Sequence, residues 1–365
     1  LIGGFAGRAI TTGGGNVAVG YASLFTQGTN GSYSTAVGFK ALEDQNISSQ
    51  SHNVAVGFYA GREITTGNEN TLIGSEAGDA LTTGIENTVL GYQALSAAQT
   101  SHANVAIGHQ SLALQSADGY TFNTAVGYNS GQQVTSGSQQ VLIGAYAGDA
   151  LTTGAQNVAI GYKALTGEDT GNKNIAIGTN ALEALNYNGD GHNIAIGHDA
   201  GKSVTTGTQN TIIGGFAGDA LTTGSFNTAV GYTALSSEDG DGGNTAIGFA
   251  ALQAQNAGQT AYNVAVGHAG GLVLSTGVQN TLVGAFAGDA LTTGERNTVL
   301  GYNALSGEDT GSRNVAIGRG SLAVLNFDGN GYNTAVGYAS GGAVSTGTLN
   351  TLIGGLAGDA ITEGS

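Results

Sequence analysis

The sequence predicts an all-β protein, a parallel β-solenoid or β-roll of about 20 coils. A short phrase, Asn-Thr/Val-x-Ile/Val-Gly, recurs along the whole 365-residue chain, for example at residues 157–161. The middle of the phrase is rich in β-branched residues, which favour strands. The spacing of the phrase is nearly constant, and a short fixed period over a whole chain is typical of solenoids, in which each repeat packs mainly against its neighbours.

The period of the phrase predicts how the chain is organised. From Gly57 onward its closing glycine returns after steps of 17, 17, 17 and 19 residues, so coils of 17–19 residues are nested in a 70-residue super-repeat. Because stacked coils share one core, we expect residues 1–365 to form a single continuous repeat region. Leu1 stands inside one phrase and Ser365 comes before the next, so we also expect the chain to be a fragment of a longer or processed protein.

The composition excludes several classes of protein and of partner. The 66 glycines do not occupy every third position, which excludes collagen, and the absence of proline suits a backbone paired in ladders. The absence of cysteine excludes disulfides and thiol chemistry. A net charge of −16, with only 9 Lys and Arg, argues against binding to nucleic acid or to anionic membranes. No apolar run is long enough for membrane insertion.

Each phrase predicts one strand of four or five residues, as at residues 210–214. Positions two and four of the phrase share one face, and the residue between them points the other way. We interpret positions two and four, which include Ile213, as the side facing the coil interior. The middle residue, usually Ala but Leu, Ile or Val in some coils, then forms an outer apolar stripe. Such a stripe needs a cover, which predicts self-association.

The closing glycines are predicted to turn the chain where a Cβ would clash or φ must be positive. Three residues later every coil has Ala, Ser or Gly, which marks a tight bend, and each coil then supplies one large aliphatic residue to a second wall. The glycine turns that we name as structural are Gly74, Gly91, Gly144, Gly161, Gly214 and Gly231.

An asparagine opens nearly every phrase. Stacked one per coil, these side chains are expected to form a ladder in which each amide donates to the carbonyl of the next. We interpret the column as structural and not as a binding site. Its members include Asn53, Asn70, Asn87, Asn104, Asn157, Asn174, Asn210 and Asn227.

The extended phrase, Asn-Thr/Val-Ala-Ile/Val-Gly-x-x-Ala/Ser, resembles the YadA-like head repeats of trimeric autotransporter adhesins and is similar to repeats of phage tail-fibre proteins. The resemblance covers essentially the whole chain. It implies a left-handed parallel β-roll, a homotrimer with an apolar stripe buried between its chains, and a location outside the cell, on the cell surface or in a virion fibre. The longer coil and the 70-residue block depart from the adhesin pattern and favour a fibre of phage type.

No catalytic constellation stands out in the sequence, so we expect neither an enzyme nor a cofactor. Calcium is the one metal with candidate ligands, because acidic, glycine-rich loops supply the oxygens that it prefers. These loops match neither the EF-hand nor the nonapeptide calcium repeat, and Asp-Gly is also ordinary turn chemistry. The weak candidates are Asp190, Asp239, Asp241 and Asp328.

Three functions remain open from the sequence. The first is a non-enzymatic structural shaft or head of an extracellular or virion fibre that supports attachment to a surface. The second is a repeated array that binds a host-surface glycan or receptor, and the third, ice binding, rests on Thr-Thr pairs that occur only in some coils. A row of tyrosines after the closing glycine would either cover a seam between chains or stack on sugars. This row holds Tyr92, Tyr128, Tyr162, Tyr232, Tyr302 and Tyr338.

Overall fold

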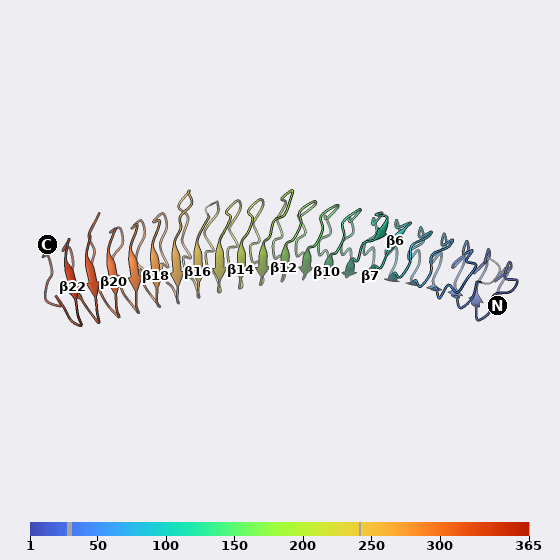
Figure 1. The fold of residues 1–365 in the computed structure, drawn as a ribbon, viewed down its shortest axis with the longest axis horizontal. Coiled ribbons are helices and arrows are strands. Elements are labelled where there is room, and N and C mark those ends of the chain that lie inside the picture. Colours follow the sequence, from blue (N-terminus) through green and yellow to red (C-terminus); the bar gives the residue numbers. More distant parts are fainter. Residues whose placement is uncertain (28–30, 241, 365) are drawn as a thin grey trace. The chain divides into compact units, whose positions relative to one another are not determined.

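The computed structural model describes residues 1–27, 31–240 and 242–364, and this part of the chain is all-β without a helix. The chain divides into two compact units. Unit 1 comprises Leu1–Asn180 with Asn186–Asp190, and unit 2 comprises Ala181–Leu185 with Gly191–Ser365. Within each unit the coils stack so that each strand lies beside the strand of the next coil (Figure 1). The prediction of a parallel β-solenoid of about 20 turns is confirmed.

Unit 1 contains one long sheet of short parallel strands and a separate parallel pair, β6 (Ser101–His102) with β8 (Gly119–Tyr120). The long sheet follows the chain, one strand per coil. Its strands are β1 (Val17–Val19), β2 (Thr35–Val37), β3 (Val54–Val56), β4 (Thr71–Ile73), β5 (Thr88–Leu90), β7 (Val105–Ile107), β9 (Thr124–Val126), β10 (Val141–Ile143), β11 (Val158–Ile160) and β12 (Ile175–Ile177).

Unit 2 repeats this arrangement, again with one parallel strand per coil in chain order. Its strands are β13 (Ile194–Ile196), β14 (Thr211–Ile213), β15 (Thr228–Val230), β16 (Thr245–Ile247), β17 (Val264–Val266), β18 (Thr281–Val283), β19 (Thr298–Leu300), β20 (Val315–Ile317), β21 (Thr334–Val336) and β22 (Thr351–Ile353).

The strands of the long sheets are three residues long, not the four or five that the sequence predicted. The reason lies at both ends of the phrase. The backbone N–H of each asparagine donates to the side chain of the preceding asparagine, as Asn227 does to Asn210 Oδ1 (2.9 Å), and not to a backbone carbonyl. At the other end the closing glycine leaves the β region, with φ of +134° at Gly214.

The two faces of the strands are the reverse of the sequence interpretation. The middle residue of each phrase points into the coil, and Ala159, Ile212 and Val299, for example, have no exposed surface. Positions two and four, including Ile213, point outward and are half-buried. Alternation along a strand fixes that the faces differ but not which of them is inside. Alanine at most middle positions leaves room for the opposite wall, which brings the large side chains.

The second wall explains why the coil comes in two versions. Four residues after the closing glycine the backbone is left-handed in both versions, with φ of +53° at Gly78 and +50° at Leu95. Where this residue is leucine, its own side chain fills the core. Where it is glycine, the aliphatic residue three positions later fills the space instead: the Cδ1 of Leu81 lies 2.8 Å from the place of a Cβ on Gly78. Both versions of the coil therefore contribute one large side chain to the core.

Packing across adjacent coils also gives a reason for the 70-residue block. In each block, two successive coils have glycine four residues after the closing glycine. The second of these two coils has a large residue, such as Ile212, at the middle position of its strand. The Cδ1 of Ile212 lies 2.9 Å from the place of a Cβ on Gly201 and 3.5 Å from one on Gly218. The large strand residue therefore fills the volume that both glycines leave open, so the pair of coils forms one packing unit.

The closing glycines meet both conditions that the sequence suggested. Gly74, Gly91, Gly144, Gly161, Gly214 and Gly231 have φ between +132° and +144°. A Cβ on Gly161 would lie 2.4 Å from the carbonyl oxygen of Gly178 in the next coil. Stacked backbones thus pass each other at this corner too closely for any side chain.

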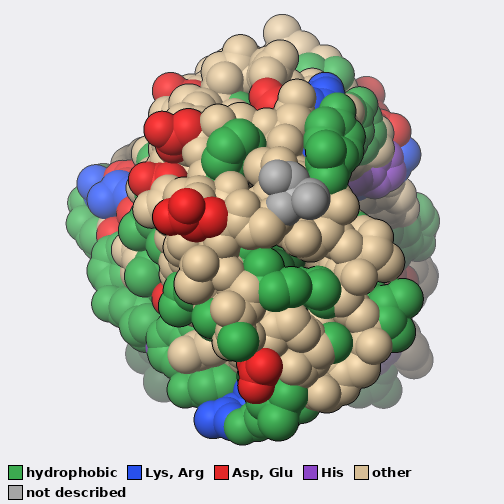
Figure 2. Space-filling model, turned by 90° about the vertical axis from the view of Figure 1, so that its left-hand side faces the viewer, with side chains coloured by type: hydrophobic (Ala, Val, Ile, Leu, Met, Phe, Trp, Pro, Cys, Tyr) green, Lys and Arg blue, Asp and Glu red, His purple; other side chains and the backbone are tan. Residues whose placement is uncertain are grey.

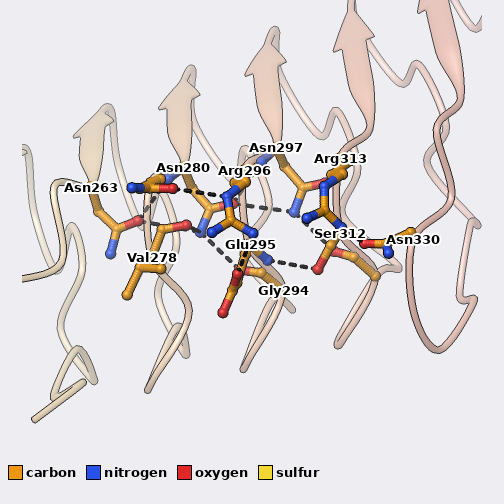
Figure 3. A network of polar contacts seen from close by, with 12 residues as sticks. Asn263, Val278, Asn280, Gly294, Glu295, Arg296, Asn297, Ser312, Arg313 and Asn330 are labelled. Carbon is orange, nitrogen blue, oxygen red and sulfur yellow. Dashed lines mark hydrogen bonds and ion pairs between the residues drawn. The ribbon is translucent and has the colours of Figure 1, made fainter. Parts of the chain in front are cut away.

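The asparagines form a buried column inside the corner of the coil. The side chains of Asn53, Asn70, Asn87, Asn104, Asn157, Asn174, Asn210 and Asn227 are buried. In the segment drawn in Figure 3, the Nδ2 of Asn280 donates to Asn263 Oδ1 (3.2 Å) and to the carbonyl of Gly294 (2.8 Å). Asn263 Oδ1 also accepts from the backbone N–H of Asn280 (2.9 Å). Donation therefore runs from each asparagine to the preceding one, opposite to the direction that we expected.

Replacing Asn210 by alanine is expected to destabilise the protein by about 2–4 kcal/mol, because it leaves a buried donor and a buried acceptor unpaired. These groups are the N–H of Asn227 and the carbonyl of Gly224, which now pair with Asn210 at 2.9 Å each. Thermal melting measures the loss. Asn210→Gln is the control, because Gln140 holds the same place in its own coil and still accepts from the N–H of Asn157. Equal melting temperatures for the two variants would contradict a structural role for the amide.

Candidate interaction surface

The outward face of the main strands is uncharged in every coil, with an aliphatic residue at position four and an aliphatic residue or threonine at position two. Across the long sheets of both units, positions two and four of the phrase hold only Val, Ile, Leu and Thr. Several of these side chains are clearly exposed, such as Leu90 at 46% and Leu300 at 48%. No charged side chain interrupts the face in either sheet. We call this surface the strand face.

A ladder of aromatic rings follows the closing glycines of unit 2. Tyr232 and Phe249 in it are about half exposed. Neighbouring ring centroids lie 4.9–6.0 Å apart, a spacing at which aromatic pairs attract by about 0.5–1.5 kcal/mol each. The rings are, in order, His198, Phe216, Tyr232, Phe249, His268, Phe286 and Tyr302.

Unit 1 has a ladder of the same kind. Its central run has centroid distances of 4.8–6.2 Å. This run holds Tyr92, His109, Tyr128, Tyr146 and Tyr162. Five of the six tyrosines that the sequence singled out are therefore parts of longer ladders, and Tyr338 lies outside them.

Sequence reasoning missed the rings that make the ladders continuous. In one coil of each block the residue after the closing glycine is small, as at Ala145 and Gly215. The next residue, Tyr146 or Phe216, then supplies the ring from a left-handed backbone with φ of +59° or +54°. The signal was the aromatic residue that directly follows the small one.

The surface at the C-terminal end of unit 2 separates apolar from acidic side chains. Figure 2 shows broad areas of hydrophobic side chains at this end, with the carboxylates gathered mainly in the upper part of the view. Tyr338 and Leu349 are exposed hydrophobic residues in this part of unit 2. The acidic side chains are therefore unevenly distributed, and part of this surface is apolar.

The calcium candidates are not gathered into a group of acidic side chains in the described residues. The Asp190 carboxylate accepts from Lys173 Nζ (2.5 Å), so a cation of the chain itself already occupies it. Asp328 Oδ1 accepts from Thr310 Oγ1 (2.5 Å), and the Asp239 carbonyl accepts from the N–H of Thr222. Asp241 lies outside the described residues. Within the described ranges, no three His, Asp or Glu side chains are grouped as a metal ion requires.

Buried carboxylates in the loops are a feature that the sequence analysis did not find. Glu168 has no exposed surface, and its Oε1 accepts from the N–H groups of Gly171 (2.7 Å) and Asp169 (3.1 Å). Glu308 is bound in the same way by Gly311. Burial raises the pKa of both carboxyls, while the backbone donors lower it. The repeated sequence Gly-Glu-Asp-Thr-Gly was the available signal.

A second set of half-buried carboxylates repeats once per block, at Asp79, Asp149, Asp219 and Asp289. In each of them Oδ1 is buried without a hydrogen-bond partner among the described residues. Burial raises the pKa of all four, and that of Asp79 reaches about 6, with a smaller contribution from nearby Glu76. These carboxyls are therefore more easily protonated in the fold than in the unfolded chain.

We expect stability to rise as the pH falls from 7.5 to 5. The folded pKa of Asp79 is about 6 and its ordinary value is 3.8, so its stabilising contribution is complete below 3.8 and is lost as the pH rises through 6. Melting temperatures across this range test the direction. Asp79→Asn should flatten the dependence more than Glu86→Gln, which removes the same charge at an exposed site. An equal effect of the two variants would assign the dependence to net charge alone.

Comparison of the chain with protein-family models, with curated proteins and with solved structures finds no match. In the described part of the chain, no helix has the length and apolar character needed to cross a bilayer.

Proposed function

We propose that this chain is a non-enzymatic structural segment, the shaft or head of an extracellular or virion fibre, in which three copies associate and support attachment to a surface. The observation that carries the proposal is the strand face, which holds only Val, Ile, Leu and Thr in both long sheets. Monomeric soluble proteins rarely leave an apolar patch of more than a few hundred Å² uncovered, and such patches mark interaction sites.

A second copy of the same chain is the partner that fits this face. Each coil completes its own core with the middle strand residue, the second wall and the asparagine column, so the strand face is not needed for folding of one chain. Because the face repeats with the coil, identical copies can meet in register over their whole length. Copies with a net charge of −16 repel one another, so they must meet along a face without charge.

The number of three chains is supported by the resemblance of the repeat to trimeric fibre heads. Three coils that each turn one flat face toward a common axis bury all three faces in a closed arrangement. Fibre attachment is the function that this architecture serves, because a stack of identical coils provides length and stability without a catalytic centre.

Native mass spectrometry of the full chain at two concentrations tests the proposal. The expected result is a stable particle of about three times 35.9 kDa. Ile213→Asp, on the strand face, should shift the particle to monomer, because the charge would be buried between chains. Ser237→Asp, on an exposed loop of the same unit, is the matched control and should leave the mass unchanged. A monomer at both concentrations would contradict the proposal.

A further inference from the structure

One coil of unit 2 interrupts the aromatic ladder with a cation. Arg319 stands directly after the closing Gly318, where neighbouring coils carry Tyr302 and Tyr338. Its Cζ lies 5.8 Å from the ring centroid of Tyr302 and 5.6 Å from that of Tyr338, within the range of cation–π attraction. Its Nη1 also donates to Tyr338 Oη (3.2 Å). The guanidinium is therefore held between two rings at the surface.

Arg319 differs from most other cations of this acidic chain, because no carboxylate pairs with it in the described residues. Lys40, Arg62, Lys173, Lys202 and Arg296 each lie within 4.0 Å of a carboxylate oxygen. Arg319 has one side-chain hydrogen bond, to a neutral tyrosine, and a guanidinium offers five N–H donors. Most of its donors are thus available to an anion that comes from solution.

A hollow of about 190 Å³ opens beside this side chain, and Asn303, Gly320 and Ala339 line it together with the two tyrosines. Its cause is local. Two residues after the closing glycine, most other coils carry longer side chains, such as Gln110 and Lys163, and four carry alanine. Gly320 is the single glycine of this column, and a Cβ added to it would meet no atom within 4 Å. In the next coil the same place holds only Ala339, so two successive small residues leave open space beside Arg319.

The wall of the hollow also contains an acceptor that lacks a donor. The Oδ1 of Asn303 is buried and has no hydrogen-bond partner among the described residues. A buried acceptor left unpaired costs about 1–3 kcal/mol. Rotation of the Asn303 amide toward the hollow would let a hydroxyl donor on a ligand satisfy this atom.

We propose that this hollow binds a sugar ring that bears a carboxylate. The Arg319 fork would hold the carboxylate through two parallel N–H···O bonds, the geometry that suits a planar anion. The rings of Tyr302 and Tyr338 would pack on the apolar C–H face of the sugar, and Asn303 would accept from a ring hydroxyl. Uronates within a polysaccharide and terminal nine-carbon acidic sugars share this chemistry.

The site lies on the aromatic ladder and not on the strand face, so it goes beyond the proposed fibre and can be tested apart from it. We expect D-glucuronate or N-acetylneuraminate to bind the full chain in saturation-transfer NMR, each titrated to 20 mM. Glucose, which lacks the carboxylate, should bind at least about tenfold more weakly, because a hydrogen bond to a charged group is worth about that factor. Acetate, which lacks the ring, should also bind more weakly, because it keeps the carboxylate but cannot pack on the tyrosine rings.

Three variants locate the binding. Arg319→Gln should weaken it about tenfold to a hundredfold. Gly320→Gln should abolish it by filling the hollow, and the backbone accepts this change because Gln93 and Gln110 hold the same place at φ of +51° and +52°. Arg313→Gln is the matched control: Arg313 also lies over a tyrosine, at 5.7 Å from the ring of Tyr332, but pairs with Asn330.

Several outcomes would overturn the site. They are failure of both acidic sugars to bind at 20 mM, equal binding of glucose or acetate, and binding that survives Arg319→Gln. If the melting temperature of Gly320→Gln is lowered, its loss of binding is not counted, and the result for Arg319→Gln alone decides whether the site exists. The relative affinities of glucuronate and N-acetylneuraminate tell which source of acidic sugar fits better. Native mass separates the two proposals, because a trimer without sugar binding overturns only the site, and a sugar-binding monomer overturns only the fibre.

Discussion

Ile212→Asp is expected to destabilise unit 2 by about 4 kcal/mol or more, the largest loss that we predict for a single substitution. The change removes a buried aliphatic side chain, which alone costs about 2–5 kcal/mol, and it adds a charge inside the core. Ile212 has no exposed surface and fills the space above Gly201 and Gly218. Thermal melting and hydrogen exchange of the strand amides in β14 and its neighbours measure the loss.

Ile213→Asp is the control, since it places the same charge one residue further along the strand. Ile213 points outward and is half-buried in the single chain. We expect it to reduce the stability of a monomer far less than Ile212→Asp, while it breaks association. Equal losses in the monomer would contradict the assignment of faces. Our interpretation from sequence placed Ile213 in the core, and this pair of variants measures the correction.

Gly214→Ala is expected to cost about 3 kcal/mol or more. The backbone of Gly214 has φ of +134°, which L-residues rarely adopt, and the new Cβ would lie 2.4 Å from the carbonyl oxygen of Gly231. Both coils would have to move apart, which disrupts the parallel ladder on each side. Chemical denaturation of the variant against the parent measures the difference in free energy.

The next residue supplies the matched control, because Gly215→Ala makes the same substitution at a position with room. A Cβ there would contact Tyr232 at an ordinary 3.4 Å, and Ala145 and Ala285 hold this place in other blocks. We expect a change within about 0.5 kcal/mol. A similar loss in both alanine variants would show that general chain flexibility, and not the close corner, explains the glycines.

Much of the fold could be predicted because the period reports it directly. Three features follow from residues that recur at fixed places, such as Gly161. They are the single strand of each coil, the glycine corner and the buried small residue three positions after the closing glycine. The inward face could not be predicted in this way, because both faces of β14 carry branched aliphatic residues. Only the volume of the opposite wall decides between Ile212 and Ile213, and this volume depends on contacts between coils.

The site was harder to predict, because it lies where one coil departs from the repeat. The tyrosine row was visible in the sequence, but the rings from Tyr146 and Phe216 depend on a left-handed backbone that periodicity does not reveal. The hollow beside Arg319 arises from Gly320, one glycine among 66. The role of Gly320 becomes visible only when it is compared with the residues at the same position of the other coils.

The direction of hydrogen-bond donation in the asparagine column determines which neighbouring coil is affected when one side chain is removed. The N–H of Asn210 has its acceptor on Asn193, one coil earlier, so it keeps that acceptor when the side chain of Asn210 is removed. The N–H of Asn227, one coil later, loses its acceptor. Amide exchange should therefore accelerate toward the C-terminus of the altered coil and stay slow on the other side. In the asparagine column, the loss of one side chain therefore removes the backbone N–H acceptor of the following coil and not that of the altered coil itself.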